Sequence, residues 1–552
     1  MKYLPNSWGS SHLWKSQRIR ARSLKNQSKS KLAISKTTKG VLTLERERKI
    51  LAERERIYQG GPDHDKIKKI GKLFVRDRLR LYFDDEQPYY ETGLFANATK
   101  EKLPADGVVT GTGKINDRLV FFMASDYTVK AGSIGKFHGE KILRIQEAAI
   151  RGRRPIVYMI DSSGGRIDEA GGYHVEKYSG GKIWYNHSML SGRVPQIAVL
   201  YGPCFAGTAY MPVFSDFVIM VDKISGMAIA SPRMVQMATG QQVDVEELGG
   251  ATMHTTKSGS ADFIAKSEEK AAELVKKLLS YLPDHFDGKL QEFPAKEPTR
   301  NPAEIDNIIP VEPNRAYDVR KLIESIVDGD SFLEVKANYA KELVTGFARL
   351  NGKTVGIVAN QPLHKGGAIF PESSDKGAKF VWTCDAYNIP LLYLCDTPGF
   401  MVGTKVEQEG ILRKGRNFIF ASSAANVPKM CVIVRKAYGA GIYAMAGPAY
   451  EPDTTIALPS AEIAIMGPEA AVNAVYYNKI KAVADPEERA ALVQKLREEY
   501  RASYDIIKLS GELVVDDLVV PSELRQELIR RYETFENKDF PLPAKKHSTI
   551  LS

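Results

Sequence analysis

Apolar and polar residues alternate along residues 107–124, and the spacing becomes helical over residues 136–151. The alternation is interrupted by Asn116 and Asp117, which predicts a β-hairpin because alternate residues of a strand face opposite sides. The apolar run at residues 155–160 then predicts a buried strand. The order of strand, helix and strand recurs further along, so the pattern predicts crossover connections and a layered α/β unit.

A second stretch of the chain repeats this pattern. The run PIVYMIDSSG at residues 155–164 matches PLLYLCDTPG at residues 390–399, an offset of 235 residues. In each half, a later strand that begins with Val-Pro leads into a turn of small residues, FAGT at 205–208 and YGAG at 438–441. The chain therefore contains two related units, head to tail.

Proline content marks the boundary between the two units. Residues 283–313 contain six prolines and little periodicity, which predicts a linker. Further helices are expected at residues 43–56, 317–326 and 487–500, and a second hairpin around Asn351 and Gly352. The predicted organisation is a basic, disordered tail at residues 1–44, an N-terminal domain at 45–290, a linker at 291–315 and a C-terminal domain at 316–552.

The net charge of +10 comes from one short stretch. Residues 1–44 contain seven Lys, three Arg and no acidic residue, and the remaining 67 basic and 67 acidic residues balance. A body without net charge gives little support to nucleic-acid binding. The basic segment is rich in Ser, so its alternatives are a disordered tail, an organellar targeting sequence and a basic binding arm.

Four cysteines in 552 residues are too few for a secreted protein stabilised by disulfides. None is spaced as C-x-x-C, so a zinc ribbon is not available. No apolar run approaches the roughly 18 residues of a membrane span. These features predict a cytoplasmic protein, or one of the mitochondrial matrix if the basic segment is a transit peptide.

The two turns of small residues are the strongest candidates for chemistry. Each follows a strand and precedes a helical pattern, so its backbone amides point outward and bind developing negative charge. Either turn taken singly is more often structural, because glycines also serve tight packing. Their recurrence at equivalent places favours one site in each copy. Two such sites suit a protein that handles two carbonyl groups at once.

Other motifs that carry chemistry are absent or weak. The loop DSSGGRIDEAGG at residues 161–172 has neither dinucleotide-binding nor P-loop spacing, and it either lines a pocket or simply turns. The sequence shows no nucleophilic triad and no histidine spacing for a metal. His254 has no visible partner and is interpreted as structural. The chemistry is therefore expected to rely on backbone amides, which suits enolate formation next to a thioester.

Several long motifs follow one another along the chain: ASDYTVKAGSIG (124–135), DSSGGRIDEA (161–170), SGRVPQIAVLYGPCFAGTAYMP (191–212), ELGGATMHTTKSGSAD (247–262), FVWTCDAYNIPLLYLCDTPGFMVGT (380–404) and AEIAIMGPEAA (461–471). In these motifs the chain resembles the carboxyltransferase β subunits of biotin-dependent acyl-CoA carboxylases, such as propionyl-CoA and 3-methylcrotonyl-CoA carboxylase. The resemblance covers residues 45–540.

The resemblance implies an α/β fold of two tandem crotonase-like domains, each a superhelix of β-β-α turns with an oxyanion hole. It implies that Ala206 and Gly207 hold the thioester oxygen of the acyl-CoA, and that Ala440 and Gly441 hold the ureido oxygen of biotin. The residues expected around the substrates are Gly164, Gly165, Phe205, Thr208, Gly439 and Tyr443. No metal is implied.

The activity implied is transfer of CO2 from carboxybiotin to the α- or vinylogous γ-carbon of an acyl-CoA. In that family carboxybiotin releases CO2, the biotin enolate takes a proton from the acyl-CoA, and the acyl-CoA enolate attacks CO2. The chain has no M-K-M biotin-attachment site and no ATP-grasp sequence, so biotin is expected on a partner subunit with a biotin carboxylase. Because the family builds each site from two subunits, a homo-oligomer, a hexamer, is also implied.

Two positions depart from the family's pattern. Ala206 stands where the family often has glycine, which keeps the amide but narrows the approach. Tyr443 stands where the propionyl-CoA branch has Asp, and the surrounding GAGIYAMAGPAY is closer to the methylcrotonyl type. The N-terminal half matches neither branch closely. The acyl group, and with it a place in fatty acid or branched-chain amino acid metabolism, stays open.

Three other functions compete with this one. The α subunit of a biotin-dependent decarboxylase of the glutaconyl-CoA type shares the fold, passes CO2 the other way and couples to a membrane sodium pump. A crotonase that acts without biotin is the second alternative, although it leaves the second turn unexplained. The third is a scaffold subunit that retains the fold without activity.

Overall fold

The computed structural model describes residues 38–84, 89–169, 175–502, 504–540 and 542–543. The chain divides into two compact units, residues 1–56 and 57–552. Helix α2 (Thr38–Tyr58) forms the described part of the first unit and confirms the helix expected there. The last seven residues of the predicted tail are thus helical, and residues 1–37 lie outside the described part.

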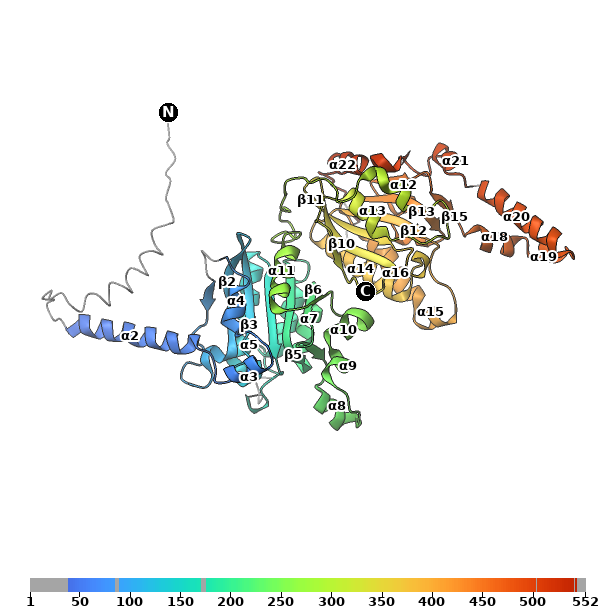
Figure 1. Ribbon diagram of the computed structural model, residues 1–552. Coiled ribbons are helices and arrows are strands. Elements are labelled where there is room, and N and C mark those ends of the chain that lie inside the picture. Colours follow the sequence, from blue (N-terminus) through green and yellow to red (C-terminus); the bar gives the residue numbers. More distant parts are fainter. Residues whose placement is uncertain (1–37, 85–88, 170–174, 503, 541, 544–552) are drawn as a thin grey trace, which may run out of the picture. The chain divides into compact units, whose positions relative to one another are not determined.

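The first copy contains a mixed sheet in the order β1-β2-β3-β4-β5-β6-β8, with β7 paired to β5 (Figure 1). Its strands are β1 (Tyr90–Thr92), β2 (Val108–Ile115), β3 (Arg118–Ser125), β4 (Ile156–Ser162), β5 (Gln196–Phe205), β6 (Phe217–Val221), β7 (Gly226–Ala228) and β8 (Phe263–Ala265). Its helices are α3 (His64–Lys69), α4 (Val75–Arg80), α5 (Lys136–Gly152), α6 (Gly180–Leu190), α7 (Tyr210–Phe214), α8 (Pro232–Thr239), α9 (Val245–Gly249), α10 (Ala251–Met253) and α11 (Glu268–Leu279).

The second copy contains a sheet of the same design, in the order β16-β14-β13-β12-β11-β10-β9 with β15 paired to β13. Its strands are β9 (Leu333–Val335), β10 (Leu343–Leu350), β11 (Lys353–Asn360), β12 (Leu391–Thr397), β13 (Lys429–Tyr438), β14 (Thr454–Ala457), β15 (Glu462–Ala464) and β16 (Asp517–Leu518). Its helices are α12 (Ile305–Ile308), α13 (Val319–Ile326), α14 (Pro371–Ala386), α15 (Thr404–Gln408), α16 (Ile411–Ala424), α17 (Gly441–Ala444), α18 (Pro468–Val475), α19 (Tyr477–Lys481), α20 (Pro486–Ala502), α21 (Ile506–Gly511) and α22 (Leu524–Thr534).

Each copy contains the hairpin that its sequence predicts. Strands β2 and β3 pair antiparallel from Val108 with Ser125 to Ile115 with Arg118. The two turn residues, Asn116 and Asp117, have φ of 50° and 61°, the left-handed conformation of the tight turns that suit the twist of a hairpin. The corresponding hairpin of the second copy, β10 and β11, turns in the same way.

After the hairpin, parallel strands carry the chain across each sheet. β4 pairs parallel with β3 and β5, and β12 pairs parallel with β11 and β13. Every residue of β4 and of β12 is buried, as expected for parallel strands that are covered on both faces. The carboxyl ends of the paired strands therefore lie side by side at one edge of each sheet, where the loops that follow them meet.

A buried lysine holds the turn that precedes each hairpin. Lys141 Nζ, on α5, donates to the carbonyl oxygen of Ala105 at 3.1 Å. Lys376 Nζ, on α14, donates to the carbonyl oxygens of Lys336 and Tyr339 at 3.0 and 2.9 Å. Burial lowers the pKa of Lys141 to about 8 and that of Lys376 to about 7.

The two copies are joined by buried contacts. The ring of Phe347, in the second copy, packs against Phe217 of the first with centroids 5.8 Å apart. Tyr387 Oη donates to the carboxylate of Asp216 at 2.6 Å, and Asp216 also accepts the backbone N–H of Gln196 at 2.8 Å. One apolar core therefore continues through both copies.

The segment predicted as a linker packs onto the second copy. Ile305 and Ile309 are buried in a core formed with α13, α22 and the strands of the second sheet. Arg525 Nη2 donates to the carbonyl oxygen of Lys296 at 3.0 Å. The prolines predicted a linker without regular periodicity, but they did not predict that the segment packs on the second copy.

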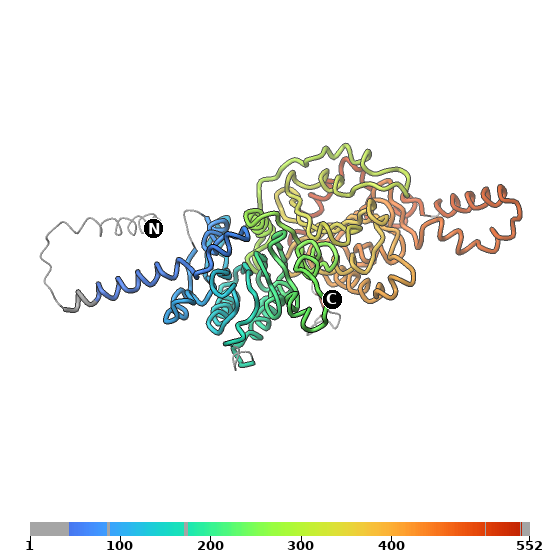
Figure 2. Tube along the Cα trace, turned by 60° about the horizontal axis from the view of Figure 1, so that its bottom comes forward, coloured from blue at the N-terminus to red at the C-terminus, as the bar shows by residue number. Residues whose placement is uncertain are grey.

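In both copies a group of helices follows a short strand, β7 or β15, that lies off the main path of the sheet. In the first copy α8 to α10 follow β7, and in the second copy α18 to α20 follow β15. Figure 2 shows the trace of α20 running back beside α18. Helix α20 confirms the charged helix expected at residues 487–500.

Candidate functional site

The strands β5 and β13 end in the same unusual backbone turn. Both strands have ten residues, so Phe205 and Tyr438 are equivalent last residues. The next residues, Ala206 and Gly439, have φ of 57° and 54°. A left-handed residue at this point swings the chain out of the strand. The sequence predicted a turn here, and the structure shows that both copies make it with a left-handed residue, alanine in one and glycine in the other.

A short helix begins directly after each turn. In the first copy it is the 3-10 turn Ala206–Ala209, and in the second it is α17 with Ala440 as its N-cap. The first N–H groups of a helix have no acceptor within the helix. Ala206, Gly207 and Ala440 are exposed, so their amides are accessible to a ligand. Gly439 is half-buried, and its N–H donates to the carbonyl oxygen of Ala464 at 3.0 Å. The residues chosen from the sequence as oxyanion donors in the first copy lie at the surface.

The register of the strands relates the residues of the second turn to those of the first. At the offset set by β5 and β13, Gly439 and Ala440 correspond to Ala206 and Gly207, whereas Gly441 corresponds to Thr208. Gly441 is buried, and a Cβ there would lie 2.8 Å from the Cα of Gly399. Glycine at 441 therefore serves packing. The sequence paired the turns by their Ala-Gly order, and Ala440 and Gly441 stay the predicted donors of the second turn because the N–H of Gly439 is bonded to Ala464.

The loops that follow β4 and β12 pack against these turns. Gly164 and Gly399 have φ of 109° and 110°, a conformation that favours glycine. A Cβ at Gly164 would lie 3.5 Å from the carbonyl oxygen of Phe205, and one at Gly399 would lie 3.2 Å from that of Tyr438. Gly164 was predicted from the sequence to lie near the substrate, and the structure places it beside the first turn.

Gly165 and Phe400 present a further amide in each copy. Ile134 donates its N–H to the carbonyl of Gly164 at 2.8 Å, and Arg166 donates to the carbonyl of Ile134 at 2.9 Å. In this parallel bridge the N–H of Gly165 points away from Ile134, toward the side on which β5 lies. Phe400 has the same bridge with Ile369. Sequence reasoning named Gly165 and missed Phe400, although the 235-residue offset marks it.

The rest of the predicted DSSGGRIDEAGG loop is only partly described. The 3-10 turn Ile167–Glu169 follows Arg166, whose guanidinium Nη1 is 2.6 Å from the buried carboxylate of Asp106. Residues 170–172 lie outside the described residues. Phe205 and Thr208 are buried, with the Thr208 hydroxyl donating to the carbonyl oxygen of Phe205 at 2.6 Å. These two side chains support the turn from beneath.

A buried aspartate lies at the end of the central strand in each copy. The cationic side chains that pair with it come from different elements in the two copies. Asp161 Oδ1 is 2.8 Å from Lys72 Nζ, and Arg78 Nη2 lies 3.7 Å from Oδ2. Burial raises the pKa of Asp161, and the two cations oppose that shift. Gly202 makes room for this pair, because a Cβ there would lie 1.9 Å from Asp161 Oδ1 and 2.2 Å from Lys72 Nζ.

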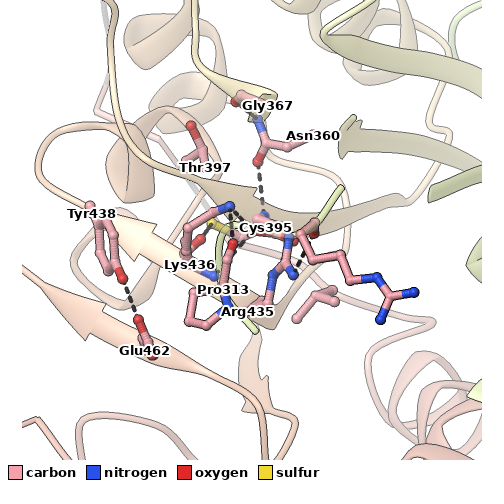
Figure 3. Close-up of polar contacts among 12 residues, drawn as sticks. Pro313, Asn360, Gly367, Cys395, Thr397, Arg435, Lys436, Tyr438 and Glu462 are labelled. Carbon is pink, nitrogen blue, oxygen red and sulfur yellow. Dashed lines mark hydrogen bonds and ion pairs between the residues drawn. The ribbon is translucent and has the colours of Figure 1, made fainter. Parts of the chain in front are cut away.

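In the second copy the counter-charge comes from the neighbouring strand. Arg435 Nε is 3.0 Å from Asp396 Oδ2, and Lys436 Nζ is 3.5 Å from Oδ1. Figure 3 shows Arg435 and Lys436 beside Pro313, whose carbonyl oxygen accepts a hydrogen bond from Lys436 at 2.9 Å. Both arrangements fix the strand end from which the glycine loop begins. The cations paired with these aspartates therefore stabilise the site indirectly, through the position of the strand end.

Matching apolar side chains are exposed around the two turns. In the first copy they are Ile167, Tyr210 and Ile229, and in the second they are Val402, Tyr443 and Ile465, with between 41% and 90% of each residue exposed. Tyr210 follows the 3-10 turn Ala206–Ala209 and Tyr443 lies in α17, while Ile229 and Ile465 follow β7 and β15. Exposed apolar groups that gather around a site mark a surface for a ligand or a partner. The predicted Tyr443 belongs to this group, and its ring stacks on Tyr450 with centroids 5.1 Å apart.

The described side chains offer little for other chemistry. His254 Nε2 is 2.7 Å from the carbonyl oxygen of Met227, and its Nδ1 is 2.8 Å from Ser258 Oγ, so both ring nitrogens are engaged. Over residues 38–543, outside the undescribed gaps, no group of three or more His, Cys, Asp or Glu side chains has a metal-binding arrangement. In the same ranges no helix combines the length and apolar character of a membrane span.

Comparison with known proteins identifies the architecture. Residues 66–550 match the carboxyl transferase domain family. The chain is 49% identical over 495 residues to uncharacterized carboxylase YngE of Bacillus subtilis, covering 89% of this chain and 96% of the relative. It is 38% identical over 514 residues to the methylmalonyl-CoA decarboxylase subunit alpha of Propionigenium modestum, covering 90% and 97%.

The fold agrees with a solved structure of the same class. The crystal structure of hexameric transcarboxylase 12S, with methylmalonyl-coenzyme A and methylmalonic acid bound, superposes with a TM-score of 0.86 at 38% identity, covering 94% of this chain and all of the other. The expected α/β fold of two crotonase-like copies is confirmed. The chain belongs to the carboxyltransferase family of biotin-dependent acyl-CoA carboxylases.

Proposed function

We propose that the chain transfers a carboxyl group between biotin on a partner protein and an acyl-CoA, with one glycine turn for each reacting carbonyl. The observation that carries this proposal is the duplicated turn, with φ of 57° at Ala206 and 54° at Gly439. The turn at Ala206 and Gly207 holds the thioester oxygen. In the second turn the amides of Ala440 and Gly441 hold the ureido oxygen of biotin, since the N–H of Gly439 donates to the carbonyl oxygen of Ala464.

Amides at these positions act where negative charge develops. Removing a proton from the carbon next to the thioester, or from the vinylogous γ-carbon, puts charge on the thioester oxygen. Fixed N–H donors stabilise that charge without reorganising, and one donor contributes about 3 to 4 kcal/mol to the barrier in other enzymes. The amide of Gly165 faces the same side and adds a donor to the first turn. Phe400 has this role in the second copy.

Biotin fits the second turn by shape and charge. Its ureido carbonyl is a small neutral acceptor, and the turn offers the exposed amide of Ala440 between two glycines, Gly439 and Gly441, so the backbone is open to close approach. When carboxylated, biotin supplies the CO2 that is transferred. Ala440, Gly441 and Phe400 would hold and orient the ureido oxygen, and the apolar rim formed by Val402, Tyr443 and Ile465 would exclude water.

We propose that a second copy of the chain completes each site. Both turns are open in the single chain, and the apolar groups around them are exposed in both copies. Facing the first turn of one subunit with the second turn of another would bury both rims and bring the two carbonyls together. The hexameric state of transcarboxylase 12S supports the expected hexamer. Biotin and a biotin carboxylase would come from a partner subunit.

The reaction can be tested without the partner. The purified chain is incubated with free biotin and malonyl-, methylmalonyl- or 3-methylglutaconyl-CoA, and loss of the carboxyl group is followed. We expect consumption of at least one thioester that depends on biotin. Consumption that is independent of biotin would instead support a crotonase. Absence of any consumption, with partner-reconstituted carboxylation also absent, would contradict the proposal and leave a scaffold role.

The decarboxylase direction stays as a second candidate because the chain covers 97% of a methylmalonyl-CoA decarboxylase α subunit at 38% identity. Both directions use the same two turns. Purification of the endogenous biotinylated partner distinguishes them. A biotin carboxylase in the complex supports carboxylation, and a membrane-embedded partner supports decarboxylation.

A further inference from the structure

An aromatic side chain closes one side of the first turn. Trp184, on α6, donates its indole N–H to the carbonyl oxygen of Gly207 at 3.2 Å. A Cβ at Gly207 would lie 3.3 Å from Cζ2 of the same indole. The ring of Tyr210 packs on the indole with centroids 5.0 Å apart at 56°. Because Trp184 is half-buried and Tyr210 is exposed, both rings reach the surface at which the amides of the turn are presented.

The helices α6 and α16 can be aligned by the contacts they make with equivalent strand residues. Tyr158 packs against the ring of His187 with centroids 4.5 Å apart. Its counterpart Tyr393 donates a hydrogen bond to Ser422 Oγ at 3.3 Å. His187 therefore corresponds to Ser422, at the same offset of 235 residues that relates the two tyrosines.

The second copy has no aromatic wall at the matching position. At this offset Trp184 corresponds to Ile419, which is half-buried. Tyr443, the counterpart of Tyr210, stacks on Tyr450, with centroids 5.1 Å apart. The first turn is thus bordered by a Trp and Tyr pair, and the second by a smaller aliphatic side chain with its tyrosine directed to another partner.

The two turns also carry their methyl group at opposite positions. The first has Ala206 before Gly207, and the second has Gly439 before Ala440. A Cβ at position 207 would lie 3.3 Å from Cζ2 of Trp184, which explains the glycine there. The alanine of the first turn is instead at position 206, although φ at that residue is 57°. The first turn is therefore narrowed on one side by a methyl group and on the other by an indole.

We propose that Trp184 is a specificity-determining residue that limits the size of the acyl group accepted at the first turn. An apolar ring beside a polar pair of amides is the arrangement by which pockets fix a thioester oxygen and sort the hydrocarbon attached to it. The inference rests on the proposed function, since it takes the ligand of the first turn to be an acyl-CoA.

Binding of acyl-CoAs of increasing length tests this proposal without requiring turnover. Dissociation constants of propionyl-, butyryl- and hexanoyl-CoA are measured by titration calorimetry on the full chain, wild type and variants. For the wild type we expect hexanoyl-CoA to bind more weakly than propionyl-CoA. Trp184→Ile, which copies the second turn, is expected to improve hexanoyl-CoA at least about tenfold relative to propionyl-CoA, the scale on which pockets sort methylenes.

Two further variants separate a size limit from a general structural effect. Trp184→Phe keeps a ring but lacks the N–H donor, and it should retain the wild-type preference. Tyr185→Ile removes the exposed aromatic next to it on α6 and should also leave the preference unchanged. An equal change for all three thioesters in Trp184→Ile, or the same change in Tyr185→Ile, would overturn the proposal.

Kinetics separate this inference from the proposed function. The ratio of kcat/KM for butylmalonyl-CoA to that for malonyl-CoA, in the presence of free biotin, should rise about tenfold in Trp184→Ile. If acyl-CoAs bind with the expected size preference but no biotin-dependent reaction occurs, the proposed function fails while the role of Trp184 stands. If the reaction occurs and Trp184→Ile keeps the wild-type ratio, only the role of Trp184 fails.

Discussion

At the scale of single residues, the two copies reach one geometry with different side chains. A left-handed residue ends β5 and β13 in the same way although it is Ala206 in one and Gly439 in the other. The aspartate at the end of the central strand is neutralised by Lys72 in one copy and Arg435 in the other. The two copies share the backbone conformation of the turn and a cation paired with the buried aspartate. These two features set the direction of the turn's amides.

Gly202 provides a direct test of how the buried charge supports the first site. A methyl group at 202 would lie 1.9 Å from Asp161 Oδ1, so Gly202→Ala must break the pair between Asp161 and Lys72. We expect a loss of about 3 kcal/mol or more, the cost of separating a buried ion pair. Thermal unfolding measures it.

The matched control is Gly180→Ala, since a Cβ at 180 meets nothing within 4 Å. This variant should unfold within a few degrees of the wild type. Equal unfolding temperatures for the two variants would show that the buried pair does not depend on glycine at 202.

At the scale of elements, periodicity predicted both hairpins, the helix that follows the first of them and the buried strands. Those signals are local, since alternation and helical spacing are set by which face of an element is buried. The repeat also located both turns. Small residues at 439, 440 and 441 look alike in sequence, and only the backbone separates them. Gly439 has a φ of 54° and an N–H bonded to Ala464, whereas Ala440 and Gly441 begin α17.

What the sequence could not provide depends on contacts between distant elements. The wall formed by Trp184 requires the register of α6 against the turn after β5, and no local pattern reports it. The amide of Phe400 is evident only from its bridge to Ile369. The packing of Ile305 in the proline-rich segment is a tertiary contact as well.

The buried lysine of α14 predicts a pH-dependent stability. Burial lowers the pKa of Lys376 to about 7, whereas an unfolded lysine titrates near pH 10.4. Between these values the unfolded chain binds a proton that the folded chain lacks, so stability rises with pH. Below pH 7 both states are charged and the cost of burial is fully present.

Lys376→Met removes this titration. From pH 7 to pH 9 the wild type should gain stability relative to the variant by up to about 1.4 kcal/mol per pH unit. Unfolding temperatures at pH 7, 8 and 9 check it, with Lys405→Met as the control because the Lys405 side chain is 87% exposed. Parallel pH profiles for the wild type and Lys376→Met would contradict the account.

At the scale of the whole molecule, the exposed rims predict that assembly and activity depend on the same surface. Ile465, which is 81% exposed in the single chain, lies next to the second turn. A carboxylate there would be buried without a partner in the proposed assembly, so Ile465→Asp should dissociate the oligomer. Sedimentation velocity measures the change.

Val311→Asp provides the control for that experiment. Val311 is 90% exposed but lies in the proline-rich segment rather than at either turn. Its variant should sediment as the wild type does. An Ile465→Asp protein that keeps the wild-type oligomeric state would show that the second rim is not an interface.

The measurement that tests the central claim most directly is complementation between variants of the two turns. Gly207→Val and Ala440→Val each add bulk beside one set of amides, and each alone should lower biotin-dependent transfer at least about 100-fold while the oligomer persists. If each site joins the first turn of one subunit to the second turn of another, co-assembly leaves some sites with both turns intact. We predict that co-expressed variants regain about a quarter of the wild-type rate, as random pairing requires. Wild-type turnover in either variant alone, or no recovery in the mixture, would contradict one turn for each carbonyl in a shared site.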